Sequence, residues 1–209
     1  MSEDARRILA EQFGVSRETL DRLSVFVDLL ARENQHQNLI ARGTFGNIWS
    51  RHILDSAQLL RFVPAAARTW LDLGTGAGFP GLVVAALHPV QVTMVESRRL
   101  RVDFLRRAAE TLALPSSTQI LCSRVERLEL PTQDVISARA FAPLDRLLDL
   151  GQRFAAPQTR WVLPKGRNAQ SELDAVRSSW QGKFHVEPSL TDPEAGIIIA
   201  EQVRRRGRG

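Results

Sequence analysis

A glycine-rich segment in the first half of the chain carries the residues with the clearest chemical meaning. Residues 71–81 have the sequence LDLGTGAGFPG. Because glycine has no Cβ, the backbone at Gly74, Gly76 and Gly78 can turn sharply and pass close to a bound ligand. The apolar run before the glycines predicts a strand, and the residues after them predict a helix. Such strand-to-helix turns bind nucleotide cofactors in α/β folds.

An acidic residue follows at the spacing that ribose binding requires. Glu96 ends the next predicted strand, 22 residues after Gly74, and a carboxylate there can accept hydrogen bonds from both hydroxyls of a ribose. Residues 76–81 match the dinucleotide pattern G-x-G-x-x-G, which leaves a nicotinamide- or flavin-dependent oxidoreductase open. Asp72 followed by the three glycines better fits the loop of methyltransferases that use S-adenosylmethionine.

The elements that must position these residues are predicted from hydrophobic periodicity. Apolar residues recur at helical spacing in residues 16–30 and 45–62. From Thr69 onward, short apolar runs alternate with helical stretches. Strands are predicted at 70–73, 91–95, 118–122, 135–138, 161–163, 183–186 and 196–200, and helices at 98–112, 143–154 and 169–180.

This alternation predicts an α/β fold with a mainly parallel sheet that is covered by helices on both faces. A short polar turn joins the last two predicted strands and suggests a closing hairpin, which makes the final strand antiparallel. We expect residues 1–64 to form an N-terminal helical extension packed on the core. Residues 65–203 are expected to form a Rossmann-like core, and residues 204–209 a basic, disordered tail.

The charge of the chain is concentrated in two places. The sequence has 28 basic and 23 acidic residues, and residues 204–209 (RRRGRG) supply four of the five net positive charges. That tail cannot bury apolar surface, so it is either a solubilising end or a nonspecific contact to nucleic acid. Residues 98–107 contain five arginines that are opposed only by Asp103. The remaining chain is nearly neutral, so net charge is minor support for an RNA partner.

Composition and the N-terminal segment exclude several classes of protein. Hydrophobic residues make up 44% and charged residues 24%, which excludes collagen, a coiled coil and wholesale disorder. Cys122 is the only cysteine; this excludes an intramolecular disulfide, suits a reducing compartment, and is expected in the core. Residues 1–7 are too polar for a signal peptide, and no apolar run could span a membrane. A cytoplasmic protein without a membrane partner is expected.

Several sequence blocks in order resemble the bacterial small-subunit (16S) ribosomal RNA guanine-N7 methyltransferase family, also called the glucose-inhibited division protein B family. The resemblance covers about residues 34–166. The blocks are RHILDS at 51–56, GTGAGFPG at 74–81, SRVE at 123–126, RAFA at 139–142 and Lys165-Gly166.

The resemblance implies a class I methyltransferase fold with S-adenosyl-L-methionine as cofactor. It implies transfer of a methyl group to N7 of a guanine in 16S rRNA of the small ribosomal subunit. Separately, we expect the protein to be a monomer. It also implies cofactor contacts at Gly74, Phe79, Val125, Glu126 and Arg139, beside the Gly76, Gly78 and Glu96 contacts expected from the loop. A methyltransferase for another substrate, and a ribosome-assembly protein without catalysis, stay open as alternatives.

The implied reaction needs no general base, because guanine N7 has an exposed lone pair and no proton to lose. Catalysis should therefore come from positioning, and no catalytic residue is assigned. Candidate substrate contacts are His52, Asp55, Arg139 and Lys165. For His52 and Asp55 the alternative is to anchor the N-terminal helices, and for Arg139 a salt bridge to a nearby acid. No metal site is expected, since His52 and Asp55 lack a third ligand.

Overall fold

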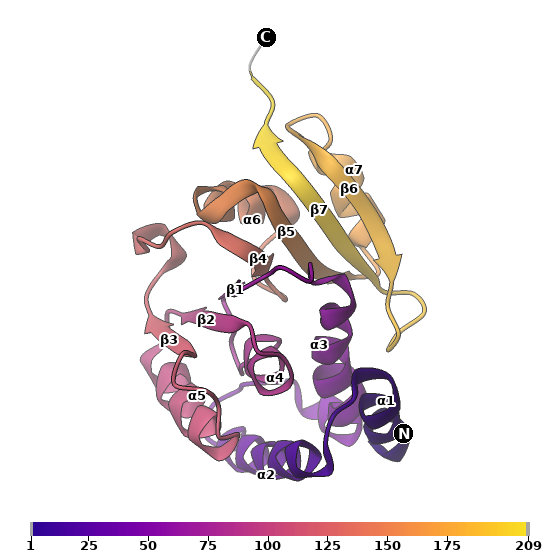
Figure 1. Ribbon diagram of the computed structural model, residues 1–209, viewed down its shortest axis with the longest axis vertical. Helices are drawn as coiled ribbons and strands as arrows, with labels where there is room; N and C mark the ends of the chain where they lie inside the picture. The colour runs from indigo at the N-terminus through magenta and orange to yellow at the C-terminus, as the bar shows by residue number, and fades with distance from the viewer. Residues whose placement is uncertain (1, 208–209) are drawn as a thin grey trace.

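Seven strands form one mixed sheet in the order β3-β2-β1-β4-β5-β7-β6 in the computed structural model, which describes residues 2–207 (Figure 1). The strands from β1 to β5 pair in parallel, and β7 is antiparallel to both of its neighbours. The predicted fold class and the antiparallel last strand are therefore confirmed. The strands are β1 (Thr69–Leu73), β2 (Gln91–Glu96), β3 (Gln119–Cys122), β4 (Gln133–Ser137), β5 (Ala155–Gly166), β6 (Trp180–Pro188) and β7 (Gly196–Arg205).

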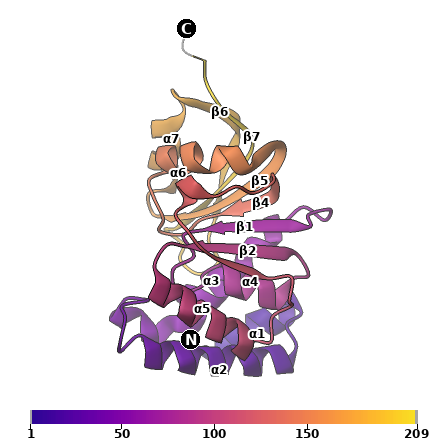
Figure 2. The same cartoon turned by 90° about the vertical axis from the view of Figure 1, so that its left-hand side faces the viewer.

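Helices cover both faces of the sheet (Figure 2). The helices α6 (Leu144–Gly151) and α7 (Ala169–Val176) pack in one hydrophobic cluster with inward-facing residues of β1, β4 and β5. The opposite face is covered by α1 (Ser2–Phe13), α2 (Arg17–Glu33), α3 (Asp55–Ala57), α4 (Gly81–Leu87) and α5 (Arg99–Thr111). Among the described residues, no helix is long and apolar enough to cross a membrane.

Side chains of β7 alternate between the hydrophobic clusters on the two faces of the sheet. Ile197 and Ile199 are buried on the face of α4 and α5, and Ile198 is buried on the face of α6 and α7. Successive side chains of a strand point to opposite faces. A run of three β-branched residues therefore fits a strand that is covered on both sides.

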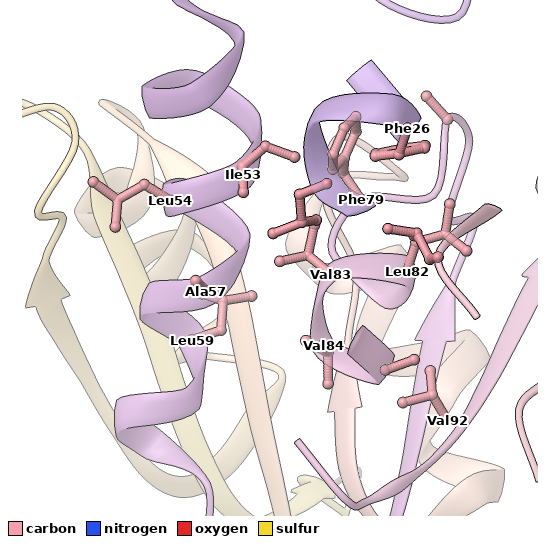
Figure 3. Packing of buried hydrophobic residues seen from close by; sticks show 14 of the residues in the cluster. Phe26, Ile53, Leu54, Ala57, Leu59, Phe79, Leu82, Val83, Val84 and Val92 are labelled. Carbon is pink, nitrogen blue, oxygen red and sulfur yellow. The ribbon is translucent and has the colours of Figure 1, made fainter. Parts of the chain in front are cut away.

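The N-terminal helices share their core with the sheet. The rings of Phe26 on α2 and Phe79 in the glycine loop lie 5.7 Å apart, and Ile53 points toward the same space from the helical segment before α3 (Figure 3). Ser16 caps the N-terminus of α2, because its side-chain oxygen accepts a hydrogen bond from the backbone N–H of Thr19. Residues before β1 are thus an integral layer of the fold.

The predicted regular helix over residues 45–62 is wrong in detail. The segment is helical but runs through a 3-10 helix (Arg42–Asn47), a π-helix (Trp49–Leu54), α3 and a second 3-10 helix (Gln58–Phe62). Two carbonyls in the π-helix accept hydrogen bonds from side chains: that of Arg51 from Arg139, and that of His52 from Ser56. Such side-chain bonds compete with a regular ladder, and π-helical turns often occur at functional sites.

The prediction of a disordered tail is wrong for residues 204–206. β7 continues through Arg205, where Arg204 pairs with Gln181 and Arg205 with Trp180. The Arg205 guanidinium lies 3.2 Å from the Asp149 carboxylate and 5.3 Å from the centre of the Trp180 ring. Basic composition alone predicts disorder for these residues, but pairing with β6 places them in a strand. Residues 208 and 209 lie outside the described part of the chain.

The prediction that Cys122 belongs to the core is also wrong. Cys122 is exposed at the end of β3, which is the edge strand of the sheet. Only the side of β3 toward β2 has a partner strand, and its two central residues, Ile120 and Leu121, are partly rather than fully buried. An apolar run at a sheet edge therefore does not bury its last residue.

The glycine loop generates a stability prediction. Gly76 and Gly78 both have positive φ, +60° and +93°, but a Cβ on Gly78 would run into the Leu82 side chain whereas a Cβ on Gly76 would lie 3.8 Å from its nearest neighbour. We expect Gly78→Ala to lower the free energy of unfolding by about 3 kcal/mol, from left-handed strain plus overpacking. Gly76→Ala should cost about 1 kcal/mol from strain alone. Urea unfolding of both variants measures the difference, and equal losses would contradict it.

Candidate functional site

Two cavities meet at the carboxyl edge of the parallel strands, where ligands bind in open α/β sheets. Cavity A has a volume of about 630 Å³ and is lined by residues that follow β1, β2 and β3, among them Gly74, Glu96, Ser123 and Val125. Cavity B has a volume of about 740 Å³ and lies between the π-helix and the hairpin of β6 and β7. Residues 140–143 line both cavities and form the wall between them.

The three predicted glycines differ in their position relative to the cavities. Gly74 has φ +67° and lines cavity A, and a Cβ there would overlap the ring of Phe141 in the wall. Gly76 and Gly78 line neither cavity and serve the turn that leads into α4. Only Gly74 is therefore placed for a close approach of backbone and ligand.

The turn itself is held by a buried carboxylate, Asp72. It is fully buried; one oxygen accepts a hydrogen bond of 3.0 Å from the N–H of Gly81 at the start of α4, and the other accepts one of 2.7 Å from the hydroxyl of Ser137 on β4. The Ser137 hydroxyl accepts in turn from the Trp70 indole N–H at 2.7 Å. Burial raises the pKa of Asp72 above its usual range. Asp72 thus ties β1, β4 and α4 together and has no place in either cavity.

Glu96 lies where the sequence predicts a ribose-binding carboxylate. Its side chain is 6% exposed and lines cavity A at the end of β2. One oxygen accepts a hydrogen bond of 2.8 Å from the N–H of Arg98, and the other lies 3.5 Å from the guanidinium of Arg101. Arg101 also donates to the carbonyl of Asn38, so the N-terminal segment helps to orient the carboxylate.

The two predicted residues after β3 also reach cavity A. Val125 is 4% exposed and gives the cavity an apolar surface. The Glu126 carboxylate is half exposed and lies 3.6 Å from Arg146, and the Glu126 carbonyl accepts a hydrogen bond from Arg153. The carbonyl of Glu126 is therefore already engaged, and Val125 lines the cavity as the edge of a buried hydrophobic cluster.

Arg139 lines cavity B and joins the two substrate candidates of the π-helical region. Its guanidinium lies 3.4 Å from the Asp55 carboxylate and 3.0 Å from Nδ1 of His52. It also lies 5.0 Å from the centre of the Phe79 ring. Asp55 and His52 therefore bind the guanidinium of Arg139. The Asp55 contact is the salt bridge that was the alternative role for Arg139.

His52 is neutral in this environment, and its tautomer follows from its neighbours. Burial and the charges of Arg139 and Arg51 lower the pKa of His52 to about 3. Because Nδ1 faces a guanidinium, which can only donate, the ring proton must be on Nε2. Nε2 then donates to the Thr44 hydroxyl at 3.0 Å, and Thr44 donates to the carbonyl of Ala41.

Phe79 lies away from both cavities. Its side chain is 2% exposed and stacks on the His52 ring at 5.0 Å, with Phe26 on another side. The implied direct contact of Phe79 with a cofactor has no support in this placement. Phe79 instead connects the glycine loop to the N-terminal helices and to Arg139.

Lys165 lines cavity B, but its ammonium is already engaged. Nζ lies 2.9 Å from the Glu172 carboxylate and donates to the carbonyl of Ala142 at 2.9 Å, and the side chain is 8% exposed. The same Glu172 oxygen accepts from the N–H of Leu144 at the start of α6. This arrangement fits a residue that holds the wall 140–143 against α7 better than one that offers a charge to a phosphate.

Sequence reasoning missed the residues of the shared wall. Ala140 has φ +51°, an uncommon conformation for a residue with a Cβ, and the turn that it makes brings Phe141 back over Gly74. Phe141 lines both cavities. Its position four residues after the end of β4, and two after Arg139, is the signal that could have identified it, because ligands bind at the carboxyl ends of such strands.

Comparisons with known proteins find relatives that match most of the chain. The family model described as rRNA small subunit methyltransferase G matches residues 19–194. A protein of Rhizorhabdus wittichii named ribosomal RNA small subunit methyltransferase G is 54% identical over 197 residues, covering 93% of this chain and 91% of the relative. A protein of Zymomonas mobilis with the same name is 47% identical over 209 residues, covering 96% and 94%.

Solved structures of lower identity share the fold. A SAM-dependent methyltransferase of Aquifex aeolicus has a TM-score of 0.59 at 16% identity, over 75% of this chain and 93% of that chain. A putative O-methyltransferase of Klebsiella pneumoniae has a TM-score of 0.58 at 16% identity, over 85% and 89%. These likenesses concern the fold; the family model and the named relatives favour the methyltransferase interpretation of the glycine loop over the nicotinamide- or flavin-dependent one.

The neutral His52 generates a prediction about pH. Its pKa is about 3 in the folded chain and near 6.5 unfolded, so the unfolded state binds the extra proton first as the pH falls. The contribution of His52 to stability is complete above pH 6.5 and declines by up to about 1.4 kcal/mol per pH unit below it.

His52→Asn keeps an acceptor near the Nδ1 position without a titrating group. Urea unfolding at pH 7.0 and pH 5.0 should show a larger loss of stability in the unsubstituted chain than in the variant. The same loss in both proteins would contradict the neutral, buried state of His52.

Proposed function

The chain belongs to the rRNA small subunit methyltransferase G family, and from this membership we propose that it transfers a methyl group from S-adenosylmethionine to N7 of a specific guanine in 16S rRNA of the small ribosomal subunit. The observation that carries the proposal is the pair of cavities that share the wall 140–143, with the buried Glu96 carboxylate in one of them. One cavity suits the cofactor, and the other suits a base that enters from the RNA.

The residues of cavity A fit S-adenosylmethionine. Its volume of about 630 Å³ lies in the usual range for cofactor sites. The Glu96 carboxylate is an acceptor for ribose hydroxyls, and Val125 offers an apolar surface for the adenine. Gly74 lines the same cavity, and its missing Cβ leaves room for the Phe141 ring. The cofactor supplies a methyl group on a positively charged sulfur.

The predicted cofactor residues accordingly divide into two groups. We assign Gly74, Glu96, Val125 and Glu126 to the wall of the cofactor site, since all four line cavity A. The second group lies outside cavity A. It consists of Gly76, Gly78 and Phe79, which belong to the turn into α4, and of Arg139, which lines cavity B.

We assign cavity B to the target guanine. Phe141 lines both cavities and can hold the flat face of a base beside the methyl donor. N7 has a free lone pair, so the chain needs to align it with the methyl group rather than remove a proton. The reaction places positive charge on the base. The Arg139 guanidinium in this cavity is paired with Asp55, which limits its repulsion of that charge.

Access of a base to cavity B requires contacts to the RNA around it. Arg98 and Arg124 line cavity A and are exposed, and within the described residues their guanidinium groups have no ion pair or hydrogen bond. Free cations of this kind suit the phosphates that flank a target nucleotide. We propose assembled or assembling small subunits in the cytoplasm as the substrate, and the monomeric state stays a prediction.

Glu96 provides the sharpest test of the cofactor site. We expect Glu96→Gln to weaken S-adenosylmethionine binding about tenfold, because one charge-assisted hydrogen bond to the ribose is lost. Titration calorimetry measures the affinity, and NAD should not bind either protein. Glu110→Gln is the matched control, since Glu110 is an exposed acid on α5 outside both cavities. Unchanged affinity of the Glu96 variant would refute the assignment.

The reaction itself is tested with small subunits that lack the modification. Incubation with radiolabelled S-adenosylmethionine should place label in 16S rRNA, and mass spectrometry of nuclease fragments should identify 7-methylguanine at one position. Cofactor binding without label in the RNA would instead favour an assembly protein without catalysis.

A further inference from the structure

The hairpin loop between β6 and β7 forms the rim of cavity B. Ser189, Thr191 and Asp192 line the cavity, and Figure 1 shows the loop beside the helical segment that contains α3. Leu190 lies between Ser189 and Thr191 but is not itself among the residues that line cavity B, and it is 46% exposed to solvent. Its neighbours on both sides in the sequence thus face the cavity that we assign to the guanine.

The loop is held in place by polar contacts to the N-terminal segment. The fully buried side chain of Gln58 accepts a hydrogen bond of 2.7 Å from the N–H of Leu190 and donates one of 3.1 Å to the Ser189 hydroxyl. The Thr191 hydroxyl donates to the Asp55 carboxylate at 2.8 Å, and Asp192 lies 3.1 Å from Arg51. The backbone of Leu190 is therefore clamped although its side chain is open to solvent.

An exposed leucine on a clamped loop differs from an ordinary surface leucine. A single exposed apolar residue is common and needs no explanation. Here, however, the buried side chain of Gln58, which also donates to Asp55, accepts a hydrogen bond from the backbone of Leu190, 132 positions away in the sequence. The surrounding rim is polar and charged, with Asp192 and Arg51 beside it. The loop therefore presents one apolar side chain at a defined place.

The proposed reaction needs a side chain of this kind. Enzymes that modify a stacked base must move it out of the stack at a cost of a few kcal/mol. Apolar side chains such as leucine insert between bases and fill the space in proteins that unstack nucleic acid. We propose that Leu190 is the wedge that enters the RNA stack as the target guanine moves into cavity B. This inference rests on the proposed function and adds a positioning residue to it.

Two measurements test the wedge with the full chain. The first is kcat/KM for methylation of small subunits that lack the modification, in which Leu190→Ala should be lowered about tenfold. The second is the fluorescence of an RNA that carries 2-aminopurine in place of the mapped target guanine. Binding of the unsubstituted protein should raise the fluorescence as the base unstacks, and Leu190→Ala should give a clearly smaller rise at saturation. The second measurement needs no cofactor.

Matched variants separate a wedge from a general surface effect. Val25→Ala removes a similarly exposed apolar side chain, 53% exposed on α2 outside both cavities, and should behave as the unsubstituted protein. Leu190→Met keeps an apolar side chain of similar length and should restore both signals. S-adenosylmethionine affinity should be the same in all four proteins, which shows that the fold and cavity A are intact.

The outcomes keep the two proposals apart. If the unsubstituted protein places no label in the RNA, the proposed function fails. If that protein is active but Leu190→Ala retains either its kcat/KM within twofold or the full rise in fluorescence, the wedge is refuted while the proposed function stands.

Discussion

One partly buried cation, the guanidinium of Arg139, links the helical segment before β1 to the end of β4 and borders cavity B. Burial lowers its pKa, and the Asp55 carboxylate at 3.4 Å opposes that shift. Breaking such a pair by removing one partner is costly, because the remaining charge stays desolvated. The other contacts of the guanidinium are neutral acceptors and an aromatic ring, namely the Arg51 carbonyl, Nδ1 of His52 and Phe79. One wall of cavity B is therefore attached to β4 through this side chain.

The wall 140–143 makes the two cavities depend on each other. Its conformation combines a left-handed Ala140 with a Phe141 ring packed over Gly74, and Lys165 and Glu172 hold it from the side of α7. A ligand that displaces Phe141 from Gly74 in cavity A also changes the surface of cavity B. Ligands in the two cavities would therefore contact the same aromatic side chain.

The arginines of the chain serve two purposes that their number does not distinguish. Arg101, Arg107 and Arg205 are engaged with acids on neighbouring elements and hold helices and strands together. Arg98 and Arg124 are exposed beside cavity A and unpaired within the described residues. Free guanidinium groups at a cavity mouth bear on RNA binding more directly than the net charge of +5 does. Arg204 and Arg205 also contribute to the net charge, but they lie in β7, where they pair with β6.

Sequence alone determined the features that depend on local pattern. The alternation of strands and helices, the antiparallel closing strand, the strand-to-helix position of Gly74 and the placement of Glu96 all follow from periodicity and from the freedom of glycine. Tertiary structure decided what each candidate side chain contacts. Arg139 meets His52 across 87 positions of sequence, Lys165 meets Glu172 on the next helix, and Phe79 lies among N-terminal rings rather than in a cavity. Burial and charge pairing depend on segments that are distant in the sequence. The sequence pattern could therefore suggest these side chains as candidates but could not assign their partners.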